Sequence, residues 1–445
     1  MTIPIINGFQ AAQAHITGLR TGGDAALPES VNARLASIFG RQISAGEAVA
    51  QIVAGVRRDG DAALRDYGRR IDGVSLESLV LAKSDLALAY EAVPPRLRDA
   101  LHRAADRIRA FHEREPKQSW LEWDGVGGGL GQIIRPLRRV GVYAPGGTAA
   151  YPSSLLMAAI PAQVAGVAEI VVATPPFDTR LDPSEPVLSI LAAAHVAGVE
   201  RVFLAGGAQA IAALAYGTET IPQVDKVVGA GGLFVTLAKK LVYGDVGIDG
   251  LYGPTETLLI ADESAKPAIA AADLLAQAEH DPLATALLIT PSARLAEAVQ
   301  VAVEQQLASL ARREIIEASL AGQGAILVID DLDQALALAN HYAPEHLCLL
   351  VADPWPLVGR VQNAGGIFVG EGSSEALGDY VVGPSHIMPT RGTARFASPL
   401  HVGDFVKVTS LFAVGQIEPE LADAARTIAQ AEGLTAHAAA VAARH

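Results

Sequence analysis

Short apolar runs that lead through glycine-rich loops into helices recur along this chain, and this recurrence limits its fold more than any other feature. Three such runs, at residues 140–143, 202–205 and 226–228, precede helical segments at 153–165, 208–216 and 234–242, and residues 169–173 form another short apolar run. A later stretch has apolar runs at residues 257–261, 286–289, 325–329 and 347–351, with helical segments between them. Strands joined through helices form parallel sheets. We therefore expect an α/β fold with two Rossmann-like parallel-sheet domains.

The N-terminal part of the chain has a different pattern. Apolar residues recur at helical spacing over residues 45–70 and 95–115, and a glycine-rich turn follows at 124–131. Near the C-terminus we expect helices over residues 421–431 and 435–444. The predicted domains are residues 1–140 with 246–390, which include the helical N-terminal part, residues 141–245, and a small C-terminal tail of residues 391–445.

Composition excludes several classes of protein. The net charge of −14 argues against a surface for nucleic acid or anionic membranes. Cys348 is the single cysteine, so a disulfide framework and a cysteine-based zinc cluster are both excluded. We see no signal peptide and no apolar stretch long enough to span a membrane, and we expect a cytoplasmic protein.

Two polar groupings stand close to predicted secondary structure. Gln277 and His280 are three residues apart on a predicted helix and share one face, so an amide oxygen and an imidazole could bind one ion. Glu345 and His346 come just before a predicted strand, and this pair is common in acid–base catalysis near neutral pH. A polar helix face and a capping carboxylate would explain the same residues without any function.

Two further groupings lie nearer the C-terminus. Asp379 is followed seven residues later by His386 in a predicted loop, and Glu432 precedes His437 close to the chain end. Each alone also fits an ordinary turn or an exposed tail. Together, Gln277, His280, Asp379 and His437 form a nitrogen and oxygen ligand set that suits zinc or a similar divalent metal.

At this point the motifs resemble those of the histidinol dehydrogenase family, in the same order and over most of the chain. The matching segments are residues 140–176, residues 206–217 (GGAQAIAALAYG), residues 273–280 (DLLAQAEH), residues 342–346 (YAPEH) and residues 375–395. The resemblance implies a zinc-dependent enzyme that oxidises a primary alcohol through the aldehyde to the carboxylate with NAD. It also implies a homodimer in which the C-terminal tail reaches the partner's site, and an NAD-binding role for residues 141–245.

The resemblance also implies roles for individual residues. Glu345 would activate the water that attacks the aldehyde, and His346 would be the general base for the alcohol. The implied zinc ligands are Gln277, His280, Asp379 and His437. Substrate-contacting positions are Thr255, His386 and Glu432, and cofactor-contacting positions are Tyr143, Gln209 and Gly232.

The chain departs from the family pattern at several of these positions. Gly232 stands where the family usually has an Asn that touches the cofactor, and Thr255 replaces the usual Ser. Residues 250–252 are also atypical. Arg391 adds a cation beside the site motif, where it could bind an anionic group of a substrate or be an ordinary surface residue.

Three functions therefore stay open at the level of sequence. Oxidation of L-histidinol to L-histidine is the first choice. A family paralogue could instead oxidise another small polar alcohol, such as 2,3-dihydroxypropane-1-sulfonate, with Arg391 as a substrate-binding residue. A zinc hydrolase would also use a metal, a Glu and a His. The strand–glycine-loop–helix units favour a nucleotide cofactor over the hydrolase.

Overall fold

The computed structural model describes residues 3–21, 29–116, 118–125, 127–146, 150–177 and 186–444. The chain divides into two compact units. The larger unit consists of Met1–Glu115 and Leu137–Phe405, and the smaller one of Pro116–Pro136 and Val406–His445. Among the described residues, no helix is long and apolar enough to cross a membrane.

The first sheet of the larger unit is entirely parallel, with the strand order β1-β12-β11-β10-β13-β14. Its strands are β1 (Ile5–Asn7), β10 (Glu256–Ala261), β11 (Thr285–Thr290), β12 (Gly324–Val328), β13 (His346–Leu350) and β14 (Gly366–Val369). All residues of β10, β11 and β13 are buried. A strand covered on both faces is expected to be apolar throughout, and this explains why the sequence predicted these three strands.

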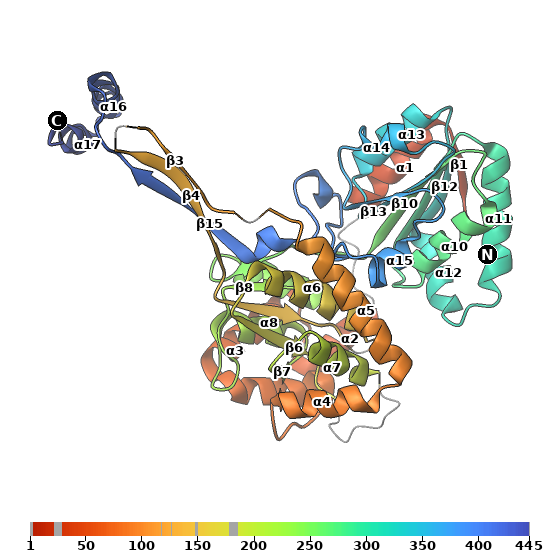
Figure 1. Ribbon diagram of the computed structural model, residues 1–445. Coiled ribbons are helices and arrows are strands. Elements are labelled where there is room, and N and C mark those ends of the chain that lie inside the picture. Colours follow the sequence, from red (N-terminus) through yellow and green to blue (C-terminus); the bar gives the residue numbers. More distant parts are fainter. Residues whose placement is uncertain are drawn as a thin grey trace. The chain divides into compact units, whose positions relative to one another are not determined.

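Helices cover both faces of the first sheet (Figure 1). Leu259, Leu288 and Ile326 face one core cluster, and the alternate residues Leu258, Leu287 and Leu327 face another. The helices of this part are α1 (Phe9–Thr21), α10 (Pro267–Ala278), α11 (Ala293–Leu307), α12 (Arg313–Gln323), α13 (Leu332–Tyr342), α14 (Trp355–Val358) and α15 (Glu375–Tyr380).

The second sheet has the order β2-β7-β6-β5-β8-β9, with β2 antiparallel and the other strands parallel. Its strands are β2 (Val80–Ala82), β5 (Arg139–Tyr143), β6 (Glu169–Thr174), β7 (Arg201–Leu204), β8 (Lys226–Val228) and β9 (Gly247–Ile248). Since β6 and β7 lie on one side of β5 and β8 on the other, the direction of winding reverses between β5 and β8. Ligands of open α/β sheets bind at such a reversal, beyond the carboxyl ends of the strands.

Eight helices are described around the second sheet. They are α2 (Glu29–Phe39), α3 (Ala45–Tyr67), α4 (Lys83–Ala92), α5 (Pro95–His112), α6 (Pro152–Ala165), α7 (Val187–Val196), α8 (Gly207–Tyr216) and α9 (Leu233–Val242). Of these, α6, α8 and α9 confirm the helices of the predicted strand–loop–helix units to within one residue. Gly147, in the predicted loop after β5, lies outside the described residues.

The helical N-terminal segment divides between the two sheets. β1 and α1 pack with β12 and α13, whereas α3 packs on α8, α4 on α7, and α5 on α6. The sequence-based grouping placed all residues up to 140 with the first sheet. An amphipathic helix shows which of its faces is buried but not which sheet buries that face, so the sequence could not distinguish these arrangements.

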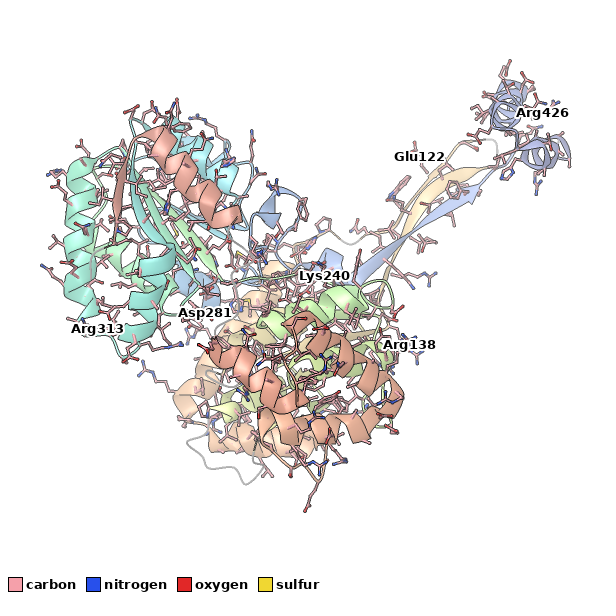
Figure 2. All side chains as sticks on the ribbon, turned by 180° about the vertical axis from the view of Figure 1, so that it is seen from behind. Glu122, Arg138, Lys240, Asp281, Arg313 and Arg426 are labelled. Carbon is pink, nitrogen blue, oxygen red and sulfur yellow. The ribbon has the colours of Figure 1, made fainter. Side chains whose placement is uncertain are left out.

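The smaller unit is built on an antiparallel sheet, β15-β4-β3, which the sequence analysis missed. Its elements are β3 (Trp120–Trp123), β4 (Gly129–Pro136), β15 (Val406–Ala413), α16 (Pro419–Ala431) and α17 (Thr435–Ala442). Glu122 on β3 and Arg426 on α16 are labelled in Figure 2. The predicted glycine-rich turn joins β3 to β4, and the two C-terminal helices are confirmed.

Candidate active site

A cavity of about 140 Å³ in the larger unit brings together six of the predicted site residues. They are Thr255, His280, Glu345, His346, Asp379 and His386. Thr255 directly precedes β10, His280 follows α10, Glu345 and His346 stand at the start of β13, and Asp379 and His386 lie in and after α15. Thus residues far apart in the sequence meet at one edge of the first sheet.

Glu345 and His346 are adjacent in the sequence, yet both face this cavity. Ala343 ends α13 with a φ of 53°, a left-handed conformation, so the chain turns sharply before β13 begins at His346. Neighbours on a regular strand point to opposite faces. The turn removes this restriction and explains how an acid and a base next to each other can share one site.

The position of its ring nitrogens decides how His346 can act. Its Nδ1 lies 3.1 Å from the backbone oxygen of Glu256, which can only accept a hydrogen bond. Nδ1 must therefore carry the hydrogen, and in neutral His346 the lone pair lies on Nε2. Nε2 is buried and has no hydrogen-bond partner among the described residues. This is the arrangement required of a general base.

The carboxylate of Glu345 is held by two hydrogen bonds to one oxygen. Oε2 accepts from the Thr255 hydroxyl at 2.6 Å and from the Glu256 backbone N–H at 3.0 Å. Burial raises the pKa of Glu345 to about 7, although the charge of His346 and these two hydrogen bonds oppose the shift. A carboxylate with such a pKa can take up a proton near neutral pH.

Gln277 offers an observation that tests whether a metal fits. Its amide nitrogen donates to the Thr255 hydroxyl at 2.9 Å, so the side chain has a fixed orientation. Its amide oxygen is buried and has no partner among the described residues. A buried acceptor without a donor is costly, and a cation would satisfy it. Gln277, with His280 and Asp379 on the cavity wall, therefore fits a divalent metal.

The predicted ligand set is nevertheless incomplete in this unit. Within the described part of the chain, no three His, Cys, Asp or Glu side chains form a group that could hold a metal ion. Glu432, at the end of α16, and His437, on α17, belong to the smaller unit, where both line a hollow of about 700 Å³. Their assignment to the site stays a prediction.

His386 is fixed on both of its ring nitrogens. Nδ1 lies 2.7 Å from the backbone oxygen of Asp379, and Nε2 lies 3.0 Å from the hydroxyl of Ser154. The carbonyl can only accept, so Nε2 accepts from Ser154 in the neutral ring. Burial lowers the pKa of His386, although the charge of Asp379 opposes the shift. These contacts favour a neutral imidazole that positions its neighbours.

Several residues of the site were not singled out from the sequence. Tyr151, Ser153 and Ser154, in and just before the first turn of α6, and Tyr380 line the cavity. Glu375 does not line the cavity, but its Oε1 lies 3.5 Å from His346 Nδ1, and its Oε2 has no partner among the described residues. Burial raises the pKa of Glu375 well above its usual range. In the sequence, only its position in the segment of residues 375–395, which resembles the family, indicated that Glu375 could belong to the site.

Arg391 does not belong to the described residues that line this cavity. Its side chain is exposed, it has a φ of 55°, and its backbone N–H donates to Glu256 Oε1 at 2.9 Å. Glu256 is in turn paired with Arg20 inside the protein. A contact between Arg391 and substrate therefore stays a prediction without support from this geometry.

The predicted cofactor residues lie beyond the carboxyl ends of strands in the second sheet. Tyr143 ends β5, and its hydroxyl accepts from the Gly207 N–H at 3.1 Å. Gln209, in the first turn of α8, donates to Asp72 at 3.1 Å, and Gly232 is the exposed residue before α9. Burial raises the pKa of Asp72 to about 6 and that of Tyr143 to about 12. This edge includes the reversal between β5 and β8.

Comparison with known proteins gives one consistent result. The family described as histidinol dehydrogenase matches residues 40–445. The histidinol dehydrogenase of Moorella thermoacetica is 54% identical over 396 residues, covering 88% of this chain and 92% of the relative. That of Deinococcus radiodurans is 49% identical over 440 residues, covering 98% and 99%. The crystal structure of histidinol dehydrogenase from Elizabethkingia anophelis, 33% identical, has a TM-score of 0.85 and covers 90% of this chain and 92% of that one.

Proposed function

The chain belongs to the histidinol dehydrogenase family of oxidoreductases, and on this basis we propose that it oxidises L-histidinol to L-histidine with zinc and NAD. One observation carries the proposal: among the described residues, both His346 Nε2 and the Gln277 amide oxygen are buried and have no hydrogen-bond partner, and His346 lines the same cavity as Glu345. A base, a metal ligand and a water-activating carboxylate are the groups that this reaction requires.

Each group has a separate task in the proposed mechanism. Bound NAD would accept a hydride in each of two oxidations, and bound zinc would hold and polarise the substrate hydroxyl. Gln277, His280, Asp379 and His437 would hold the zinc. In the first oxidation, His346 Nε2 takes the hydroxyl proton, and the alcohol becomes the aldehyde. Its Nδ1–H, donated to Glu256, keeps the ring in the required tautomer and orientation.

Glu345 serves the second oxidation. Both of its hydrogen bonds end on Oε2, so Oε1 is the oxygen that accepts a proton from water. The water oxygen then forms a bond to the aldehyde carbon as the C=O π bond opens, which gives the anion of the hydrate. This anion would give the second hydride to bound NAD and release its remaining hydroxyl proton, which leaves the carboxylate. Thr255 links Glu345 to Gln277 and so sets the distance between the water and the proposed metal.

The alternatives gain no support from the site. Oxidation of a sulfonate diol would need a cation at the cavity, and Arg391 is not among the described residues that line it. A zinc hydrolase would not need the glycine loops at the winding reversal of the second sheet.

The first test is NADH formation by the zinc-loaded enzyme. With L-histidinol we expect about two NADH per substrate consumed, because the alcohol is oxidised twice. Removal of zinc with a chelator should abolish turnover, and added zinc should restore it. Dihydroxypropanesulfonate is the comparison substrate. Turnover of the sulfonate alone, or none with either alcohol, would contradict the proposed function.

We further propose that two copies of the chain share each active site. Glu432 and His437 belong to a different compact unit from the cavity. Large apolar side chains on that unit are exposed, among them Phe412 at 78% and Ile428 at 61%. A second copy that covers this surface would bury them and could deliver His437 to the metal site of its partner.

Mixing two inactive variants tests this sharing. One variant chain carries His346→Asn and lacks the base. The other variant chain carries His437→Ala and lacks the predicted metal ligand. If the tails are exchanged, each mixed dimer has one site with both defects and one with neither. Random reassociation should therefore restore about a quarter of the wild-type activity. A mixture as inactive as its components would show that His437 does not act in the partner's site.

A further inference from the structure

A fully buried ion pair lies directly behind the glycine loop of residues 229–232. Lys239, on α9, pairs with Asp249, which follows β9, and each side chain is only 1% exposed. Burial of two opposite charges contributes little net stability, because desolvation offsets their attraction. The contribution of the pair to the structure therefore depends mainly on its contacts with other groups.

Both partners bind the backbone of one residue, Gly229. Lys239 Nζ donates to the carbonyl oxygen of Gly229 at 2.8 Å, and Asp249 Oδ2 accepts from its N–H at 2.7 Å. Asp249 Oδ1 also accepts from the N–H of Gly250 at 2.8 Å, and Lys239 Nζ lies 4.9 Å from the centre of the Tyr252 ring. The ion pair thus fixes both polar backbone groups of Gly229.

Gly229 is held on its other side by Tyr143. Its φ is +113°, and a Cβ at this position would lie 2.3 Å from the Tyr143 carbonyl oxygen. A residue with a side chain is therefore excluded by both the conformation and the space. Tyr143 ends β5 and Gly229 follows β8, the two strands between which the winding of the sheet reverses.

We propose that Lys239 and Asp249 are positioning residues that hold the loop of residues 229–232 in the conformation that binds the dinucleotide. This inference rests on the proposed NAD-dependent function. Gly232, the last residue of the loop, has no side chain to contact the cofactor, and Ala230 has only a methyl group, so the polar groups that the loop can offer all belong to its backbone. Their placement then depends on how firmly the loop is anchored at Gly229.

Affinity for NAD⁺, measured by calorimetric titration of the full-length enzyme, tests the inference. In the double variant Lys239→Met with Asp249→Leu, no unpaired charge is left behind, so it should be more stable than either single change although the polar backbone groups of Gly229 lose their partners. The loop nevertheless loses its anchor. We expect the Kd for NAD⁺ to rise by about tenfold or more, with the KM for L-histidinol changed by less than about twofold.

Two other variants complete the test. Asp249→Asn retains an acceptor oxygen and should weaken NAD⁺ binding less than the double variant does. It also keeps the inference testable if the double variant folds poorly. Lys240→Met changes the neighbouring, exposed lysine of α9 (labelled in Figure 2) and should bind NAD⁺ like the wild type.

The outcomes separate the inference from the function on which it rests. Wild-type affinity for NAD⁺ in both Asp249→Asn and the folded double variant would show that the pair only stabilises the fold and would overturn the inference. A wild-type enzyme that neither binds NAD⁺ nor oxidises L-histidinol would instead overturn the proposed function. Loss of NAD⁺ affinity that follows loss of thermal stability in every variant would also count against positioning.

Discussion

Replacing Glu345 by Gln is expected to stop the enzyme at the aldehyde. Gln can still accept hydrogen bonds from Thr255 and from the Glu256 N–H, so the cavity should keep its shape. It cannot take a proton from water. We expect oxidation of the aldehyde to slow by about 10²–10⁴-fold, the usual contribution of a general base, while oxidation of the alcohol stays within about threefold of wild type.

The measurement compares the two steps directly. NADH formed per L-histidinol consumed should fall from about two towards one, and the purified aldehyde should become a poor substrate. Glu263→Gln, which changes an exposed carboxylate just after β10, is the matched control and should behave like wild type. Equal losses on both steps would show that Glu345 is not the group that activates water.

The pH dependence of the aldehyde step gives the same prediction a second readout. Burial raises the pKa of Glu345 to about 7, so its carboxyl group is largely protonated at lower pH. A protonated carboxyl cannot accept a proton from water. The aldehyde step should therefore slow as pH falls through about 7, and Glu345→Gln should remove this dependence.

Local patterns in the sequence predicted the buried strands, whereas the roles of the site residues came from the family resemblance and stay predictions. Residues 258–261 are all apolar because helices cover both faces of the sheet, and such an apolar run can be recognised in the sequence alone. Gln277 and His280 were placed on one helix face. The structure ends α10 at Ala278, so His280 lies just beyond the helix, but it still lines the cavity.

Other parts of the site depend on contacts that no local pattern contains. Ser154 is one small polar residue in an apolar helix, and it reaches the site only because α6 lies against the segment of His386. Lys239 lies in the last turn of α9. A lysine at this position is normally exposed to solvent, where its charge interacts favourably with the helix dipole. Its burial follows from the position of Asp249, ten residues later.

The antiparallel sheet of the smaller unit was missed for a related reason. All four residues of β3 are exposed, and every residue of β15 is exposed or only half-buried. Alternation between a buried and a solvated face is the main sign of an antiparallel strand. A sheet that is mostly exposed in a single chain does not show this alternation. Its exposure agrees with the proposal that a second copy of the chain covers the sheet.

Replacing His346 by Asn is expected to abolish the first oxidation instead of the second. The Asn amide nitrogen can take the place of Nδ1 and still donate to the Glu256 carbonyl, so only the ring atoms around Nε2 are lost. Without that nitrogen the substrate hydroxyl has no base. We expect kcat for the alcohol to fall by about 10²–10⁴-fold, with zinc content and the Kd for NAD⁺ unchanged.

The contrast with Glu345→Gln makes this prediction decisive. Single-turnover formation of NADH should be slow in His346→Asn from the first hydride, whereas Glu345→Gln should give a first turnover near the wild-type rate. His341→Asn, an exposed histidine at the end of α13, controls for loss of an imidazole. If His346→Asn kept a fast first turnover, the free Nε2 would not be the base, and the proton would have to leave through another group on the cavity wall. His386 could not easily take that role, because its Nε2 already accepts from Ser154 and its Nδ1 donates to the Asp379 carbonyl.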